Sequence, residues 1–340
     1  MSSEPKILLL DEPTSSLALA ETRILFDLIR KCKKRGVIVI YISHRLQELW
    51  EIADNCTVLR DGHLIGKKTL KDLPRKELLS MMFGESKQSK HPDDLMKSDE
   101  IIMEIKHISS GNKVKDISFN LHKGEVLGIA GMLGSGRTEL LRTIFGIDEK
   151  SKGEIIINGN AVRHLSPVSM KALGVGLTPE DRKNEGLIQI MSVKNNLCVA
   201  ALPKLKKALG FIDADIETQI SDNQIAELGI KVPSPQVEVS SLSGGNQQKV
   251  VVGNWLNTDP KIMMFDEPSR GIDVVAKQQI FKIIWELSKS GVSSIVVSSE
   301  LDELVDVCQR ILIMRYGKII GEVQSDEITV EQLYARCMGE

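Results

Sequence analysis

One glycine-rich stretch in the middle of the chain, residues 131–138 (GMLGSGRT), most limits what this sequence can fold into. It lies between an apolar run, residues 126–130, and a segment of helix-forming residues, 139–145. This order is typical of a strand, a loop and a helix. Glycines in such a loop let successive backbone N–H groups point at an anion, and the helix adds the positive end of its dipole. The stretch therefore predicts a cradle for nucleotide phosphates.

The spacing of this loop fits the phosphate-loop pattern GxxxxGK[ST] at all positions but one. Gly131 and Gly136 match the two glycines, and Thr138 matches the expected Mg²⁺ ligand. Arg137 stands where lysine is usual. An arginine keeps the positive charge but is a planar fork, so we expect phosphate binding to survive better than catalysis. Taken alone, the loop fits an ordinary tight turn as well as a nucleotide site.

The composition excludes several classes of protein. The chain has 340 residues, enough for two domains, and 42% of them are hydrophobic, which is normal for globular proteins. A formal net charge of -2 without a basic block argues against a nucleic-acid partner. The 5 cysteines are scattered, so neither a disulfide framework nor a zinc site is expected. We expect no signal peptide and no transmembrane helix, which would need roughly 20 apolar residues.

The first part of the chain, residues 1–85, alternates between strands and a helix. The apolar residues 7–10 run into an Asp-Glu-Pro sequence at 11–13 and predict a parallel strand that is buried on both faces. A helix over residues 21–34 and a second buried strand over 37–42 complete a βαβ unit. None of the glycines in this part forms a phosphate loop.

An internal repeat organises the chain. The Asp-Glu-Pro sequence recurs at 266–268, a shift of 266 − 11 = 255 residues. The same shift relates further identical residues, among them Ser43 and Ser298, Leu46 and Leu301, Arg60 and Arg315, and Gly62 and Gly317. Residues 6–85 and 261–340 are therefore two ungapped copies of one unit, which indicates duplicated domains. Only the second copy is preceded by a further domain-sized segment, residues 101–260, and the polar residues 86–100 connect the two parts.

A second helix start that suits an anion lies in residues 242–249 (LSGGNQQK). Ser243 can cap the helix, and Gly244 and Gly245 leave backbone N–H groups free. Two such helix starts suit one triphosphate only if they close on it from opposite sides.

Three ordered motifs now resemble those of the ATP-binding cassette (ABC) family. They are the segment 242–249, the pair Asp266 and Glu267, and the sequence Gly-Ile-Asp at 271–273. Residues 128–139, 179–183 and 297–300 resemble, more narrowly, the second cassette of the tandem ATPases that power bacterial monosaccharide importers, such as those for ribose, galactose and xylose. The resemblance covers essentially the whole chain.

The resemblance implies an α/β fold of the P-loop NTPase type. Residues 101–340 would form a complete ABC cassette, with a mixed sheet, helices on both faces and a helical subdomain. Residues 1–85 would be the C-terminal part of a first cassette, and residues 86–100 a linker. Because members of this family carry two complete cassettes, we expect about two thirds of the first one to be missing, its phosphate loop and signature included.

The resemblance also implies roles for single residues. The loop would hold the phosphates, Thr138 and Asp266 would hold Mg²⁺, and Glu267 would position the attacking water. Glu12 and His44 would be the catalytic glutamate and the switch histidine of the first copy. The residues expected to bind ATP are Gly131, Gly134, Ser135, Gly136, Arg137, Thr138, Glu180, Ser243, Gly244, Gly245, Asp266 and Asp273.

Some positions depart from the family pattern. Glu180 stands where a glutamine usually senses the γ-phosphate, and it adds a negative charge near an anion. Ser299 replaces a switch histidine and is too short for that work. Phe119 is the sole aromatic residue between 101 and 123, so no base-stacking residue is assigned. Arg182, with the lysine after it, is either a solvated charge run or a contact to phosphate or a partner.

In this family each ATP lies between the phosphate loop of one cassette and the signature of the other. The first site of this chain would have Glu12, His44 and the signature at 243–245, but no phosphate loop. The second would have the loop but no opposing signature. We therefore expect the chain alone to bind ATP weakly and to hydrolyse it slowly or not at all.

The leading hypothesis is an energy-coupling subunit of a monosaccharide importer, peripheral to the cytoplasmic face of the cell membrane. Its partners would be membrane permease subunits and a periplasmic or extracellular sugar-binding protein, and the expected helix over residues 215–228 is the candidate contact. A separately encoded N-terminal half or a second copy of the chain would complete the first part. The alternatives are a non-catalytic remnant or regulatory nucleotide-binding module, and a soluble cassette ATPase of translation or DNA repair.

Overall fold

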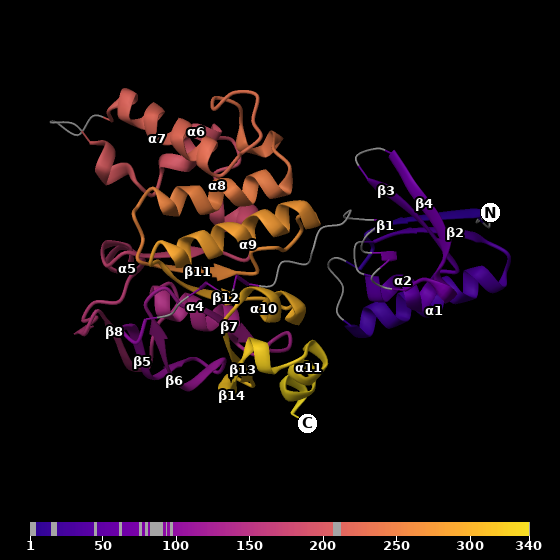
Figure 1. The fold of residues 1–340 in the computed structure, drawn as a ribbon, viewed down its shortest axis with the longest axis horizontal. Coiled ribbons are helices and arrows are strands. Elements are labelled where there is room, and N and C mark those ends of the chain that lie inside the picture. The colour runs from indigo at the N-terminus through magenta and orange to yellow at the C-terminus, as the bar shows by residue number, and fades with distance from the viewer. Residues whose placement is uncertain are drawn as a thin grey trace. The chain divides into compact units, whose positions relative to one another are not determined.

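The computed structural model describes residues 5–14, 19–43, 46–60, 63–74, 77–78, 81, 91–92, 94–95, 98–206 and 212–339. The chain divides into two compact units, unit 1 (Met1–Lys87) and unit 2 (Gln88–Glu340) (Figure 1). That these units are one partial and one complete cassette stays a prediction. None of the helices among the described residues combines the length and the hydrophobicity that crossing a bilayer requires.

Unit 2 is built on a six-stranded sheet with the strand order β10-β11-β12-β7-β13-β14. Its strands are β7 (Val126–Ala130), β10 (Val175–Thr178), β11 (Ile262–Asp266), β12 (Ser293–Val297), β13 (Arg310–Arg315) and β14 (Lys318–Gln324). All neighbours pair in parallel except β14, which runs antiparallel to β13. Every residue of β7, β11 and β12 is buried, because apolar side chains on both faces are covered.

A second sheet of unit 2 is antiparallel, with the order β6-β5-β8-β9. Its strands are β5 (Ile101–Ser110), β6 (Val114–His122), β8 (Lys152–Ile157) and β9 (Asn160–Ala161). Together with α4 (Arg137–Phe145), this sheet packs on one face of the six-stranded sheet and forms one apolar core with it. Leu127 and Ile129 of β7 point into this core, whereas Val126 and Ala130 point to the other face.

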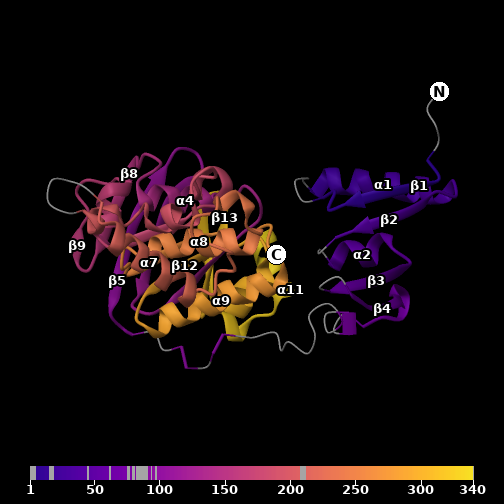
Figure 2. The same cartoon turned by 90° about the horizontal axis from the view of Figure 1, so that it is seen from above.

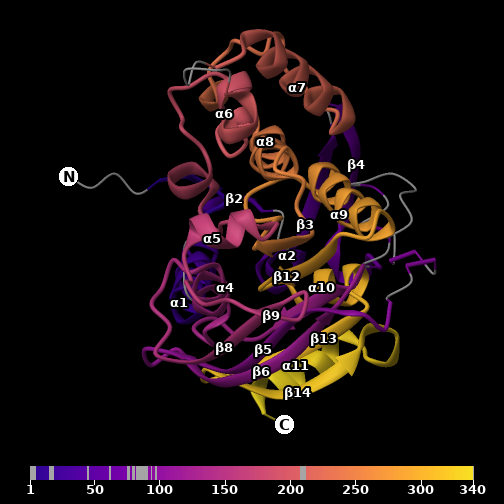
Figure 3. The same ribbon diagram turned by 90° about the vertical axis from the view of Figure 1, so that its left-hand side faces the viewer.

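Helices cover that other face and also form a separate end of unit 2. The face is covered by α9 (Val274–Lys289), α10 (Leu301–Val307) and α11 (Val330–Met338). The separate end contains α6 (Val193–Cys198), α7 (Ala214–Glu227) and α8 (Gly244–Leu256), which share a third apolar cluster (Figure 3). A mixed sheet with helices on both faces and a helical subdomain confirms the predicted α/β fold. The helix predicted over residues 215–228 is α7.

Part of the predicted linker belongs to the core of unit 2. Leu95 is 7% exposed and packs among residues of β7, β11 and α9. The side-chain amide of Gln309 donates to the Leu95 carbonyl at 2.6 Å, and the His91 N–H donates to the Asp306 carbonyl at 2.6 Å. These described residues of the segment 86–100 are thus attached to unit 2.

The described part of unit 1 contains two separate strand pairs (Figure 2). In the first, β1 (Ile7–Asp11) pairs in parallel with β2 (Ile38–Ile42); in the second, β3 (Asn55–Arg60) pairs antiparallel with β4 (His63–Thr69). The helices are α1 (Leu19–Lys34) and α2 (Leu46–Ile52). Phe26 and Ile29 of α1 are buried and cover one face of the first pair.

The prediction that residues 7–10 and 37–42 form strands buried on both faces is wrong. Along both strands, exposed residues alternate with half-buried ones. Ile7 and Leu9 are 56% and 70% exposed, and Ile38, Ile40 and Ile42 are similarly exposed. The physical reason is that α1 covers one face only, and no described residue covers the other.

The two sequence copies share an unusual backbone feature. Glu12 and Glu267, which are 255 residues apart, both have positive φ, 42° and 47°. Each is fixed by the strand beside it, because the Glu12 N–H donates to the Ile42 carbonyl and the Glu267 N–H to the Val297 carbonyl, both at 2.9 Å. A non-glycine residue at positive φ is strained. The carboxylate at the end of the strand is therefore held in the same way in both copies.

In both copies a buried glutamate accepts a hydrogen bond from a hydroxyl at the corresponding position. The Thr14 hydroxyl donates to Glu48 at 2.7 Å, and at the corresponding positions the Ser269 hydroxyl donates to Glu303 at 2.6 Å. Both glutamates are buried, at 8% and 2% exposed. Where the structure describes both copies, the sequence repeat is thus also a repeat of structure.

Candidate nucleotide-binding site

The glycine loop joins the end of β7 to the start of α4, at the carboxyl edge of the parallel strands. Gly136 is the N-cap of α4 and has φ 102°, and a Cβ there would lie 2.1 Å from the Lys113 carbonyl oxygen. A Cβ on Gly131 would lie 2.5 Å from the Met314 carbonyl oxygen. The path of the loop therefore requires glycine at both positions that the phosphate-loop pattern fixes. With glycine as its N-cap, α4 has no side-chain cap, so its first N–H groups can meet an anion.

Arg137 is the buried cation of this site. Its residue is 6% exposed, and its guanidinium donates to the Ser298 carbonyl and, at 3.4 Å, to Glu267 Oε1. The other oxygen of Glu267 accepts from the Ser299 N–H at 2.9 Å and from the Ser299 hydroxyl at 3.0 Å. A phosphate in the loop would have to share the guanidinium with these acceptors.

Thr138 lies between two carboxylates. Its hydroxyl is 3.2 Å from Asp266 Oδ1 and 3.4 Å from Glu180 Oε2. Burial raises the pKa of Asp266 to about 7; the Thr138 hydrogen bond opposes this shift, and the charges of Glu180 and Glu267 add to it. Burial also raises the pKa of Glu267, although Arg137 and the hydrogen bonds from serine oppose it. The site therefore holds more carboxylate charge than its own cation neutralises.

These residues fit a divalent cation. A hydroxyl and a carboxylate oxygen are the hard ligands that Mg²⁺ takes, usually with phosphate oxygens and water completing the shell. The raised pKa of Asp266 reflects a buried carboxylate that a cation would keep ionised. Among the described residues there is no group of three or more His, Cys, Asp or Glu side chains that could hold a metal without such help.

Glu180 and Arg182 have partners that sequence reasoning did not find. Glu180 forms an ion pair with Arg270, and Arg182 donates to the backbone carbonyls of Arg270 and Gly271. Arg182 is thus half-buried against the segment that follows Glu267 and is not a freely solvated charge, whereas its contact with phosphate or a partner stays a prediction. No spacing rule links residues 88 to 90 positions apart, so the sequence carried no signal for these contacts.

Ser243 is the N-cap residue of α8, as predicted, but its side chain does not bond to the backbone of the helix. Its backbone has the extended conformation of an N-cap, but the hydroxyl accepts from the Asn246 amide at 2.9 Å and makes no cap hydrogen bond. The first N–H groups of α8 are therefore not bound by this hydroxyl. A Cβ on Gly245 would lie 2.3 Å from the Ala276 Cβ, so the start of α8 requires glycine. Asp273 caps α9 by accepting from the Ala276 N–H at 3.0 Å.

The structure brings together five candidate residues, on three segments of unit 2: Arg137, Thr138, Glu180, Asp266 and Glu267. A cavity of 220 Å³ opens beside them, and its lining includes Thr138, Glu180, Asp266 and Arg270. No hydrogen bond of the described residues joins Ser243, Gly244 or Gly245 to the glycine loop.

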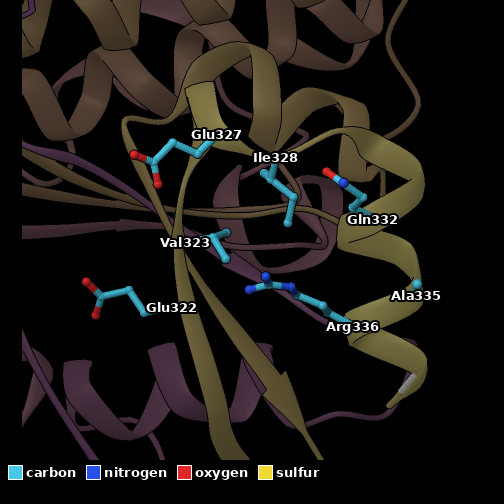
Figure 4. A pocket seen from close by; sticks show the side chains of 7 residues that line it. All are labelled: Glu322, Val323, Glu327, Ile328, Gln332, Ala335 and Arg336. Atoms are coloured by element: carbon cyan, nitrogen blue, oxygen red, sulfur yellow. The ribbon is translucent and has the colours of Figure 1, made fainter.

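A larger cavity, of 490 Å³, lies apart from these residues (Figure 4). It is lined by β14, the turn that follows it and α11, and Arg336 reaches from α11 toward β14. None of the predicted site residues lines it. The candidate residues therefore meet at the glycine loop and not at this cavity.

The candidates in unit 1 are only partly described. His44 lies outside the described residues. Glu12 is exposed, whereas its counterpart Glu267 is mostly buried. Phe119 is 8% exposed and packs in the core of unit 2, so it cannot stack on a base.

The chain is similar to ATP-binding proteins of sugar import systems. Residues 114–270 match the family model described as ABC transporter. The chain is 40% identical over 333 residues to the ribose import ATP-binding protein RbsA of Clostridium tetani, which covers 98% of this chain and 66% of that protein. It is 38% identical over 347 residues to the xylose import ATP-binding protein XylG of Brucella abortus. This match covers 100% of this chain and 68% of that protein. The chain spans about two thirds of the length of these relatives.

Solved structures support the same fold. The ADP conformation of the ATP-binding cassette MJ1267 superimposes with a TM-score of 0.58 at 20% identity, covering 70% of this chain and 95% of that one. For cbiO1 from Clostridium perfringens the TM-score is 0.58 at 23% identity, and the match covers 70% of this chain and 94% of that one. At such identity the likeness concerns the fold alone. Together with the identity to RbsA and XylG, it shows that the chain belongs to the ABC transporter family of ATP-binding proteins, in the branch that contains these sugar-import members.

Proposed function

We propose that the chain is an ATP-binding, energy-coupling subunit of a monosaccharide import system. The observation that carries this proposal is the meeting of the glycine loop, Arg137, Thr138, Asp266 and Glu267 in one site, in a chain similar to sugar-import ATP-binding proteins. Phosphoryl transfer needs positioning and neutralisation of charge, which these residue types supply.

In the proposed mechanism the N–H groups of the loop and the guanidinium of Arg137 bind the phosphates of ATP. Thr138 and Asp266 would hold Mg²⁺, which neutralises charge on the transferred phosphate. Glu267, kept at positive φ at the end of β11, orients the water that attacks the γ-phosphate. Ser299 steadies the Glu267 carboxylate through two hydrogen bonds.

We infer that the chain alone hydrolyses ATP slowly. Both oxygens of Glu267 accept hydrogen bonds from Arg137 and Ser299, so the carboxylate must leave a partner before it can accept a proton from water. This arrangement also favours the alternative function, a regulatory module that binds nucleotide without turning it over.

The partners that fit this function are the permease subunits of a sugar importer and a sugar-binding protein outside the membrane. We place the chain itself at the cytoplasmic face of that membrane. The support is the similarity to ribose and xylose import proteins. Within unit 2, α7 is the proposed contact with the permease, because it lies at the helical end with Ile216 41% exposed.

A further partner is proposed for unit 1. The exposed residues of β1 and β2 and their counterparts 255 positions later are Ile7 and Ile262, Leu9 and Met264, Ile40 and Ile295, and Ile42 and Val297. The residues of unit 1 are 48 to 70% exposed, whereas all four counterparts are 0% exposed. In unit 2 those counterparts pack in the core that α4 and the antiparallel sheet complete. Unit 1 therefore lacks a cover of that kind within the described residues.

We propose that a polypeptide with a segment like residues 101–178 supplies this cover. Its equivalent of β7 would pair with β2 and β3, as β7 pairs with β12 and β13. A second copy of the chain fits less well, because its own β7 already has a partner on each edge. The fitting partner is therefore an N-terminal cassette half with a segment of that kind.

The experiment is calorimetry of ATP binding to the purified chain with Mg²⁺, together with an ATPase assay. We expect saturable binding with turnover close to background. Absence of binding would overturn the nucleotide site, and robust turnover that Glu267→Gln abolishes would overturn slow hydrolysis. Co-expression with an N-terminal cassette half should give a complex with raised turnover, whereas a homodimer of the chain would contradict the proposed partner.

A further inference from the structure

The turn between β13 and β14 carries a strained aromatic residue. Tyr316 has φ 51° and is 74% exposed. A bulky residue at positive φ is an outlier, and such outliers cluster at functional sites. The corresponding residue of the first copy is Asp61, a residue type that turns favour at positive φ. Unit 2 thus carries a strained tyrosine where an ordinary turn residue occurs in its repeat.

Backbone contacts attach this turn to the glycine loop. The N–H of Gly317 donates to the Ser135 carbonyl at 2.9 Å, and the carbonyl of Gly317 accepts from the Lys115 N–H at 2.7 Å. A Cβ on Gly317 would lie 2.6 Å from the Lys113 carbonyl oxygen, so the approach is close. Tyr316 is therefore one residue away from a direct contact with the predicted phosphate cradle.

The ring of Tyr316 has a cation on one side. The Arg315 guanidinium lies 5.0 Å from the ring centroid, a distance at which a cation is attracted to an aromatic face. The other aromatic residues on the segments that surround the loop are buried: Phe119 is 8% exposed and Phe145 is 3% exposed. Among the described residues around the loop, Tyr316 is the aromatic side chain that a ligand can reach.

We propose that Tyr316 is the platform on which the base of the bound nucleotide stacks while its phosphates lie in the glycine loop. This proposal rests on the proposed nucleotide site. Every nucleobase has flat apolar faces, and an aromatic ring that a guanidinium holds in place offers a matching surface. The backbone strain at Tyr316 lies in the turn that contacts the loop through Gly317.

The test compares a nucleotide with a ligand that lacks a base. Calorimetry with Mg²⁺ measures the Kd of ATP and of inorganic tripolyphosphate for the wild type, Tyr316→Asn, Tyr316→Phe and Tyr334→Ala. Asparagine tolerates positive φ and adds no charge, so this variant keeps the turn. Tyr334 on α11 is 48% exposed and serves as a matched control.

We expect Tyr316→Asn to weaken ATP binding by roughly 10-fold, within the range for loss of one stacked base, and to leave tripolyphosphate binding unchanged. Tyr316→Phe and Tyr334→Ala should bind both ligands like the wild type. The variant Tyr316→Trp adds a tryptophan at this position. ATP should quench the emission of that tryptophan, and tripolyphosphate should not.

Two outcomes overturn the proposal alone: ATP binding that Tyr316→Asn leaves unchanged, and an equal loss for both ligands, which would make the turn a support of the loop only. A wild type that binds neither ligand overturns the nucleotide site and this proposal with it.

Discussion

The guanidinium of Arg137 and the carboxylate of Glu267 form an ion pair at 3.4 Å, joining the start of α4 to the end of β11. Both side chains are mostly buried, at 6% and 11% exposed. The cation that we expect to bind phosphate is therefore in contact with the carboxylate that we expect to position water.

The first prediction concerns competition within this pair. Glu267→Gln should bind ATP about 5-fold more tightly than the wild type, because it frees part of the guanidinium, and a partly buried pair is worth on the order of 1 kcal/mol. Arg137→Ala is the control and should bind ATP more weakly. Calorimetry of ATP with Mg²⁺ measures both, and an unchanged or weaker affinity of Glu267→Gln would show that the pair does not compete with phosphate.

The second prediction concerns pH. Burial raises the pKa of Asp266 from 3.8 to about 7. The folded state therefore binds this proton more tightly than the unfolded state, and the free energy of unfolding falls as the pH rises from about 4 to about 7. The fall from this group is at most about 4 kcal/mol, at 1.36 kcal/mol per pKa unit.

Denaturant unfolding of the nucleotide-free protein at several pH values measures this slope. The Asp266→Asn variant should lose the share of the slope between pH 4 and 7 that Asp266 contributes, whereas the share of Glu267 and Glu303, whose pKa values burial also raises, should remain. Above pH 7 the variant should be the more stable protein. Parallel curves for the two proteins would contradict the assignment.

The third prediction separates two loop glycines. Gly134→Ala adds a methyl group with no atom within 4 Å, so only its φ of 79° is costly, at about 1 kcal/mol. Gly136→Ala would place a Cβ 2.1 Å from a backbone oxygen, and we expect it to destabilise unit 2 by about 1–3 kcal/mol more. It should also weaken ATP binding more than Gly134→Ala. Thermal unfolding and calorimetry test this order, and equal effects would contradict it.

The fourth prediction uses the repeat. Leu9→Lys should change the stability of unit 1 by less than about 0.5 kcal/mol, because the side chain is 70% exposed. Met264→Lys, at the corresponding buried position, should destabilise unit 2 by more than about 4 kcal/mol. Hydrogen exchange of each unit reports the two effects separately. A large loss in Leu9→Lys would mean that the chain itself covers this face.

Local features of the site were predictable from the sequence, because they depend on adjacent residues. The strand, glycine loop and helix around residues 126–145 follow from their order in the chain, and so does the position of the carboxylates after β11. The repeat was equally visible, since a constant shift relates identical residues such as Ser43 and Ser298.

Features that depend on distant segments were not predictable. The apolar pattern of residues 7–10 is that of a buried strand, yet its exposure depends on which segments cover it. The contact of Ser299 with Glu267 was missed for a similar reason, because it depends on the fold, which places the backbone N–H and the hydroxyl of this short residue beside the carboxylate. The interaction of Glu180 with Arg270 joins residues 90 positions apart.

Glu12 has a left-handed backbone at the end of β1, where its N–H donates to the Ile42 carbonyl of β2. The same conformation occurs at Glu267 in unit 2, beside the glycine loop, so it recurs in a copy whose described residues include no such loop. A backbone conformation that neighbouring strands hold is thus a feature that duplication of the unit can preserve.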